Sequence, residues 1–389
     1  MGLSRISQVA DKLAVDLGFA TVITVAGTNG KGTSCAFLEN ALIGEGKSVA
    51  VYSSPHIEKF NERLRLDKHD MADDSFIRAF ELVEQARGEI SLTYYEFTTL
   101  AAFLVLMEKR PDVIILEVGL GGRLDATNII DADISVITTV DLDHQTFLGN
   151  DRESIGFEKA GIMRGNGISV VGDKNPPRSV LSHADKIKTQ LYVREQDFKL
   201  VKHANSWDWQ FKGSRLENLC LPNIPMDNVA TALTVLSLLE IELSSEKVNQ
   251  VIAKTKVAGR TEIFQLDCDV MLDVGHNPQA TSYLASKIKD GHYRHVYAVV
   301  GMLKDKDITN SLLPMNKLVS QWYLAGLSVP RGAFANEIAN QMPDAHASFN
   351  CFDNVTQAYK MALKSAGVGD LVVVFGSFFT VAEIRRLLV

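Results

Sequence analysis

Residues 27–33 read Gly-Thr-Asn-Gly-Lys-Gly-Thr, a combination of residue types suited to binding phosphate. Glycines let backbone N–H groups close around an anion, and the N-terminus of a following helix adds partial positive charge. Lys31 is expected to reach the β- and γ-phosphates of a nucleotide, and the Thr33 hydroxyl to face a magnesium ion. The strict phosphate-loop pattern fails at Val25 and Gly32, and a glycine-rich turn alone is more often only a turn. Because a strand-like run precedes it and a helical pattern follows, we predict phosphate binding.

Polar side chains follow three further strand-like runs. Glu117 precedes a glycine-rich loop, His144 comes after two aspartates, and Ser54 follows a short apolar run. Taken singly, each of these residues is as readily structural as functional. Parallel α/β sheets bind ligands at the carboxyl ends of their strands, so the three side chains are expected to meet at one cation. Hydroxyl, carboxylate and imidazole ligands at an open site suit Mg²⁺ bound to nucleotide phosphates.

The same arrangement recurs in the last third of the chain. Asp273 and His276 flank a glycine that follows an apolar run, and Pro278 is a favourable first residue for the helix predicted next. Arg260 follows Gly259 at a predicted domain junction. It is there either as a solvated linker charge or as a clamp on nucleotide phosphate.

The elements that must position these residues alternate between strand and helix. Apolar, β-branched runs predict buried parallel strands at 21–26, 48–53, 112–118, 134–139 and 167–171, and again at 270–274, 295–300, 321–325 and 371–375. Helical patterns lie between them, which predicts α/β architecture with helices covering parallel sheets. Residues 198–212, around two tryptophans, predict an antiparallel hairpin, and residues 227–239 predict a helix with Asp227 as its N-cap.

Composition narrows the class of protein. The chain has 389 residues, which favours two domains, and we place the boundary between residues 258 and 259. A net charge of −7 argues against a nucleic-acid binder. The four cysteines form no CxxC pair, as expected of a reducing compartment. Because no signal peptide is visible and the apolar stretch 97–107 is too short to span a bilayer, we predict a cytoplasmic protein without a membrane partner.

Taken together, the motifs resemble the folate branch of the Mur-type ATP-dependent amide ligases, the bacterial dihydrofolate synthases/folylpolyglutamate synthases. The matching strings run in order along most of the chain: AGTNGKGT (26–33), YSSPH (52–56), LTYYEFTTLAA (92–102), EVGLGGRLDATN (117–128), DHQTFLG (143–149), EKAGI (158–162), AGRTE (258–262), DVGHNP (273–278) and FGS (375–377). The resemblance implies an ATP-binding domain of the P-loop Mur-ligase type over 1–258, with a parallel sheet. It implies a smaller, Rossmann-like glutamate-ligase domain over 259–389.

The resemblance also implies roles for individual residues. Those expected to bind nucleotide are Thr28, Asn29, Gly30, Lys31, Gly32, Thr33, Asn228, Arg260 and Asp273. Those expected to hold two magnesium ions are Thr33, Ser54, Glu117, His144 and a carbamylated Lys159. Those expected to be catalytic are Lys31, His144, Lys159 and His276, the last near the incoming glutamate. Those in segments expected to line the pterin-side pocket are Thr93, Tyr95, Arg123 and Ala126.

The activity implied is addition of L-glutamate to dihydropteroate and to the γ-carboxylate of folyl-glutamates, through an acyl phosphate formed from ATP. The alternatives are a monofunctional folylpolyglutamate synthase, another Mur-type ligase, a P-loop kinase, or a nucleotide-regulated binding module without catalysis. A kinase would account for residues 21–33 but not for Asp273 and His276, and a binding module would leave the other strand-end clusters unexplained. We expect a monomer.

One departure from the family concerns the N-terminus. Members usually carry an additional helix before the segment that matches residues 2–6, and part of it contributes to dihydropteroate binding. The given sequence starts at this point. We therefore expect weaker use of dihydropteroate than of a glutamylated folate.

Overall fold

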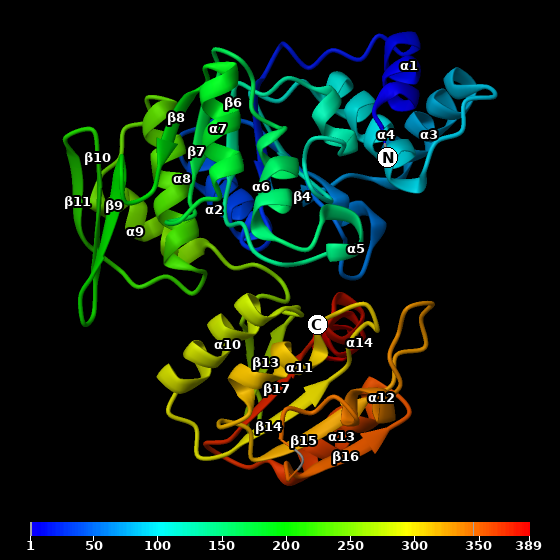
Figure 1. Ribbon diagram of the computed structural model, residues 1–389, viewed down its shortest axis with the longest axis vertical. Coiled ribbons are helices and arrows are strands. Elements are labelled where there is room, and N and C mark those ends of the chain that lie inside the picture. Colours follow the sequence, from blue (N-terminus) through cyan, green and yellow to red (C-terminus); the bar gives the residue numbers. More distant parts are fainter. Residues whose placement is uncertain (1, 345) are drawn as a thin grey trace. The chain divides into compact units, whose positions relative to one another are not determined.

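The computed structural model describes residues 2–344 and 346–389. The chain divides into two compact units, Met1–Thr255 and Lys256–Val389, and each has its own sheet (Figure 1). The boundary predicted between residues 258 and 259 falls just inside the second unit. No helix in the described part of the chain is long and apolar enough to cross a membrane.

The first unit is built on an eight-stranded sheet with the order β4-β3-β2-β5-β1-β6-β7-β8. Its strands are β1 (Thr21–Ala26), β2 (Val49–Tyr52), β3 (Leu64–Leu66), β4 (His69–Asp70), β5 (Val113–Glu117), β6 (Ile134–Ile137), β7 (Ile168–Val171) and β8 (Gln190–Val193). Pairing is parallel from β2 through to β8, and only β3 and β4 are antiparallel additions. The five runs predicted as parallel strands here are therefore confirmed.

Helices cover both faces of this sheet. They are α1 (Ser4–Lys12), α2 (Lys31–Gly44), α3 (Asp73–Arg87), α4 (Tyr94–Lys109), α5 (Gln145–Leu148), α6 (Arg152–Ala160), α7 (Arg178–Ile187), α8 (Met226–Leu238) and α9 (Ser245–Lys254), with short 3₁₀ turns η1 (Phe60–Arg63) and η2 (Ala126–Ile129). Val22 and Ala26 point to one face of β1, where apolar clusters join the sheet to α1, α3, α4, α6 and α7. Helix α2 packs against β1, β2 and β5 and against α8 and α9.

A small antiparallel sheet forms from β9 (Phe198–Lys202), β10 (Trp207–Phe211) and β11 (Ser214–Leu219). The predicted hairpin is confirmed, but the third strand of this sheet was not predicted, because most residues of β11 are exposed. The Trp209 indole donates to the Ala230 carbonyl at 3.1 Å, which attaches this sheet to α8. The predicted N-cap of α8 is wrong. Pro225 is the N-cap, and the Asp227 carboxylate pairs instead with Arg194 at 2.9 Å.

The second unit contains a six-stranded sheet with the order β12-β13-β17-β14-β15-β16. Its elements are β12 (Glu262–Gln265), β13 (Asp269–Asp273), α10 (Pro278–Asp290), β14 (Val296–Val300), α11 (Ile308–Leu312), η3 (Leu313–Met315), β15 (Gln321–Ala325), α12 (Ala335–Ala339), β16 (Phe349–Phe352), α13 (Val355–Ser365), β17 (Leu371–Phe375) and α14 (Phe378–Leu388). The four predicted strands are its buried centre. The edge strands β12 and β16 were not predicted, because their side chains are largely exposed and lack the apolar run of a central strand.

The parallel order brings several predicted site residues to one edge of the first sheet. The loops after β1, β2, β5 and β6 all leave from the carboxyl ends of adjacent strands. These loops carry residues 27–30, Ser54, residues 118–125 and His144, while Glu117 is the last residue of β5. The fold therefore positions the site through strand order, as α/β sheets do.

Candidate active site

The glycine-rich turn after β1 is fastened to the segment after β6. The Thr28 amide donates to the Thr139 carbonyl at 2.8 Å, and the Thr28 hydroxyl donates to the Asp141 carbonyl at 3.0 Å. The Thr138 hydroxyl donates to the Asn29 carbonyl at 2.6 Å. The Asn29 amide also donates to the Thr139 hydroxyl at 3.1 Å, so these bonds fix the turn against the segment after β6.

Gly30 is required at its position for two separate reasons. Its φ of 90° lies in the left-handed region, and a Cβ there would come within 2.5 Å of the Asn228 side-chain oxygen. Asn228 comes from the first turn of α8, and its amide nitrogen donates to the Thr33 hydroxyl at 2.7 Å. The Thr33 hydroxyl in turn donates to the Gly30 carbonyl at 3.0 Å. The predicted nucleotide residues of the turn and of α8 are thus in direct contact.

Lys31 begins α2 and folds back over the turn. Its ammonium donates to the Gly27 carbonyl at 2.9 Å, which places the charge above the cradle. Lys159, in the last turn of α6, is buried, with 3% of its surface exposed. Burial and the nearby Lys31 lower the pKa of Lys159 to about 7, although Asp143 opposes the shift. A lysine in this state is largely deprotonated at slightly alkaline pH and can react as an amine.

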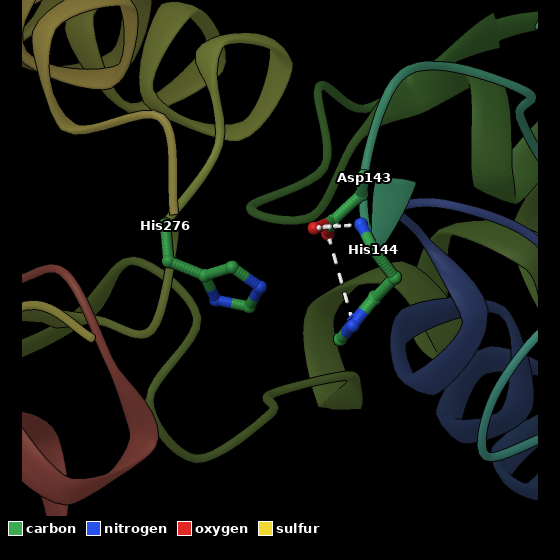
Figure 2. Close-up of side chains that lie close together, drawn as sticks. All are labelled: Asp143, His144 and His276. Atoms are coloured by element: carbon green, nitrogen blue, oxygen red, sulfur yellow. Dashed lines mark hydrogen bonds and ion pairs between the residues drawn. The ribbon is translucent and has the colours of Figure 1, made fainter. Parts of the chain in front are cut away.

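Asp143 and His144 form the end of the loop after β6 (Figure 2). The His144 amide donates to one oxygen of the Asp143 carboxylate at 2.8 Å, and the imidazole Nε2 lies 4.0 Å from the other. His144 has a φ of 50°, so its backbone is in the left-handed region directly before α5. Asp143 was not among the predicted site residues. The only signal for it in the sequence was that it is one of the two aspartates before His144.

Glu117, Ser54 and Tyr95 gather beside the start of α2. The Glu117 carboxylate is buried, and its oxygen lies 3.7 Å from the position that a Cβ on Gly32 would take. Burial raises the pKa of Tyr95 well above its ordinary value, with smaller contributions from Asp125, Tyr52 and Glu117 and an opposing one from the Ser54 hydroxyl. The Tyr95 hydroxyl has no hydrogen-bond partner of good geometry among the described residues. It is therefore a buried polar atom suited to a ligand.

The other predicted substrate residues have protein partners. The Thr93 hydroxyl accepts the Glu96 amide at 3.2 Å and so caps α4. The Arg123 guanidinium pairs with Glu158 at 2.8 Å and stacks on a neighbouring phenyl ring. Ala126 is 4% exposed and belongs to the apolar cluster under α4. These side chains are held by the protein itself.

Asp125 is the residue that organises this loop, and it was not predicted. It is buried, and one oxygen accepts the amides of Gly119 and Leu120 at 3.1 and 3.0 Å. The other oxygen accepts the Thr127 amide and hydroxyl at 3.0 and 2.7 Å. Burial raises the pKa of Asp125 against these four hydrogen bonds. A carboxylate with four donors shapes the loop that follows Glu117, and only the string LDATN hinted at it.

Asp273, Arg260 and His276 form a second set, within the second unit. Asp273 ends β13 and is buried, and its two oxygens accept the amides of Thr261 at 2.8 Å and Gly275 at 2.7 Å. Burial raises the pKa of Asp273, while Arg260 opposes the rise. His276 Nδ1 lies 2.9 Å from the Val274 carbonyl, so Nδ1 carries the proton and Nε2 is the basic atom when the ring is neutral.

Two family models of Mur ligase domains match this chain. The Mur ligase middle domain matches residues 25–218, and the glutamate ligase domain of Mur ligases matches residues 259–378. The fold and the glycine-rich nucleotide turn are those of a Mur ligase. The dihydrofolate synthase/folylpolyglutamate synthase of Escherichia coli K12 is 42% identical over 393 residues, which cover 100% of this chain and 91% of the relative. The chain belongs to the dihydrofolate synthase/folylpolyglutamate synthase family.

Solved structures agree with this assignment. E. coli FolC in complex with DHPP and ADP superposes with a TM-score of 0.95 at 42% identity, covering 100% of this chain and 93% of that one. A bifunctional folylpolyglutamate synthase/dihydrofolate synthase with Mn, AMPPNP and L-glutamate bound has a TM-score of 0.94 at 43% identity, with coverage of 100% and 94%. The expected architecture of two α/β domains is confirmed.

The role of Asp125 can be tested by replacing it with asparagine. An amide group must turn its NH₂ toward one of the two pairs of donors, so at least one backbone amide loses its acceptor and faces another donor. Asp125→Asn should lower the free energy of unfolding by about 2 to 4 kcal/mol, as measured by urea denaturation. The exposed Asp185→Asn is the matched control and should change it by less than about 0.5 kcal/mol. Equal effects of the two substitutions would contradict the assignment.

Proposed function

We propose that this protein is an ATP-dependent carboxylate–amine ligase of folate biosynthesis. It adds L-glutamate to dihydropteroate and to the γ-carboxylate of folyl-glutamates. The observation that carries the proposal is the preformed cradle of residues 27–33, closed by Asn228 and flanked by Glu117 and Lys159. It is supported by family membership and by the DHPP, ADP, AMPPNP and L-glutamate named for the related structures.

The two domains have different binding roles in this proposal. Residues 1–258 bind ATP and the pteroate or folate acceptor, and residues 259–389 contribute to nucleotide and glutamate binding. Nucleotide contacts are assigned to residues 28–33, Asn228, Arg260 and Asp273. The acceptor lies against the segments of Thr93, Tyr95, Arg123 and Ala126, with the unpartnered Tyr95 hydroxyl as its hydrogen-bonding atom.

The chemistry proceeds in two displacements. A carboxylate oxygen of the acceptor attacks the γ-phosphorus of ATP, the bond to the bridging oxygen breaks, and an acyl phosphate and ADP result. The amine of glutamate then attacks the acyl carbon, and phosphate leaves from the tetrahedral intermediate to give the amide. Lys31 neutralises phosphoryl charge in the first step, and the basic Nε2 of His276 lies in the segment assigned to glutamate.

The residues present fit a divalent cation. Thr33 and Ser54 offer hydroxyl oxygens, Glu117 a buried carboxylate and His144 an imidazole, a mainly oxygen-donor set suited to Mg²⁺. When bound, the cation neutralises phosphate charge and orients the nucleotide. Two ions are proposed, and the second would be held by a carbamylated Lys159.

Lys159 can hold a cation only if its charge is inverted. An ammonium repels Mg²⁺, whereas a neutral amine that captures CO₂ loses a proton and becomes an anionic carbamate with oxygen ligands. The burial that lowers the pKa of Lys159 to about 7 supplies the neutral amine. We therefore assign Lys159 as a carbamate in the active enzyme.

The ligase activity can be tested by following ADP. ADP should form only when ATP, Mg²⁺, L-glutamate and a pteroate or folate acceptor are all present. Comparing dihydropteroate with tetrahydrofolate and its glutamylated forms separates the bifunctional enzyme from a monofunctional folylpolyglutamate synthase. Stable transfer of phosphate to a hydroxyl compound, without glutamate dependence, would instead establish a kinase.

The cation site can be tested at Glu117. Glu117→Ala removes the carboxylate assigned to the ion, so kcat/KM should fall on the order of a hundredfold or more, as for loss of one preorganised charge. Glu117→Gln keeps the shape and should lose nearly as much, because the charge is what matters. Glu242→Ala, an exposed glutamate, is the control and should retain activity. Full activity of Glu117→Gln would remove Glu117 from the site.

The carbamate can be tested at Lys159. Lys159→Ala should abolish most activity, with partial rescue by a short exogenous carboxylate, whereas the exposed Lys186→Ala should behave as wild type. Because the amine is neutral mainly above pH about 7, recovery of CO₂-depleted enzyme by bicarbonate should increase as pH rises through that value. Full activity in CO₂-free buffer, or no rescue at any pH, would contradict the carbamate.

A further inference from the structure

Arg260 lies in a turn whose backbone is strained. Gly259 has a φ of 63° and Thr261 a φ of 44°, so the residues on both sides of Arg260 are in the left-handed region. Glycine adopts this conformation freely, but a β-branched threonine does so only at a cost in energy. Such a conformation persists when surrounding contacts impose it.

Two carboxylates impose the conformation of this turn. The Gly259 amide donates to Glu262 Oε2 at 2.8 Å, and the Thr261 amide donates to Asp273 Oδ2 at 2.8 Å. The Gly259 carbonyl also accepts the Val274 amide at 2.9 Å. The peptide groups on both sides of Arg260 are therefore fastened to groups within the second unit.

Helix α14 reaches this turn at two places. The Arg260 guanidinium stacks on Phe378, with 5.0 Å from its central carbon to the ring centroid. Arg385 donates through Nε to both oxygens of Glu262, at 3.3 and 3.1 Å. Phe378 and Arg385 are seven residues apart, two helical turns, and so lie on the same face of α14. One helix face thus contacts the Arg260 side chain and the acid that holds its backbone.

The Glu262–Arg385 pair differs from an ordinary surface ion pair. Each side chain is only 21% exposed, and the Glu262 carboxylate already accepts a backbone amide. By contrast, Arg386, the next residue of α14, is exposed. An exposed pair contributes little because water competes with it. Here the guanidinium of Arg385 fixes the rotamer of Glu262, and Glu262 fixes the position of Gly259.

We propose that Glu262 and Arg385 are positioning residues for Arg260. They hold its turn in the conformation that places the guanidinium on Phe378 and beside the Gly259 carbonyl, where it is assigned to contact a nucleotide phosphate, and they touch no substrate themselves. This inference rests on the proposed function, in which Arg260 contacts ATP.

Arg385→Ala should raise the KM for ATP about tenfold and leave the KM for L-glutamate nearly unchanged. The reason is that a displaced Arg260 weakens the binding of ATP, which it is assigned to contact, and not that of L-glutamate. Arg385→Lys should restore part of the loss, since it returns the positive charge without the Nε geometry. Glu262→Gln still accepts the Gly259 amide and should show a smaller defect. Arg386→Ala is the matched control on the same helix and should leave both KM values unchanged.

The test is completed by combining each change with Arg260→Ala. If the pair acts through Arg260, Arg385→Ala should add nothing to the KM for ATP of the Arg260→Ala enzyme. An additive loss, or a wild-type KM for ATP in both Arg385→Ala and Glu262→Gln, would overturn the inference. If Arg260→Ala itself leaves ATP binding unchanged while the ligase reaction proceeds, the assigned role of Arg260 fails separately. Thermal unfolding of each variant shows whether a KM change accompanies loss of the fold.

Discussion

The constraint on which the candidate site depends is the contact between Gly30 and Asn228. Gly30 must be in the left-handed region, and the Asn228 amide occupies the space that any side chain there would need. The same amide holds Thr33, so a residue on α8 fixes both the end of the turn and the start of α2. The Trp209 indole of the small antiparallel sheet donates to the Ala230 carbonyl of α8. The same helix therefore contacts both this sheet and the candidate site.

Around this contact the first unit buries charges that water would otherwise solvate. Asp125 is stabilised by four donors from its own loop, and Lys159 responds to burial through a lowered pKa. Hydrogen bonding of Asp125 and the lowered pKa of Lys159 have different consequences. A fully hydrogen-bonded carboxylate is structural, whereas an amine with a pKa of about 7 is partly neutral near that pH, and its neutral form has a lone pair available for chemistry.

In the second unit, carboxylates bind the backbone on either side of Arg260 and so fix the position of this segment. Asp273 and Glu262 each accept an amide from the segment around Arg260, and they lie at the same end of the paired strands β13 and β12. A long cationic side chain has many rotamers, so its direction is best controlled by fixing the backbone on either side. The stacking of Arg260 on Phe378 then restricts the remaining freedom of the guanidinium.

The central parallel strands, the glycine-rich turn and the strand-end residues Glu117 and Asp273 were all predictable from sequence. Their signals are local: an apolar run, a glycine at a turn, a polar residue directly after a strand. The edge strands β12 and β16 were not, because an edge strand is defined by its neighbour and has no apolar run of its own.

The partners of several side chains were decided by tertiary structure, because they lie far away in the sequence. Arg385 lies more than a hundred residues from the Glu262 that it holds, and Asn228 is 195 residues from the Thr33 hydroxyl to which it donates. The N-cap of α8 was predicted wrongly for a related reason. Aspartate is a common N-cap residue, but the Asp227 carboxylate forms an ion pair with Arg194. Sequence determined which groups could do chemistry, because residue type and local conformation are local properties. Burial and long-range pairing decided how those groups are charged and held, because both depend on what the folded chain places beside them.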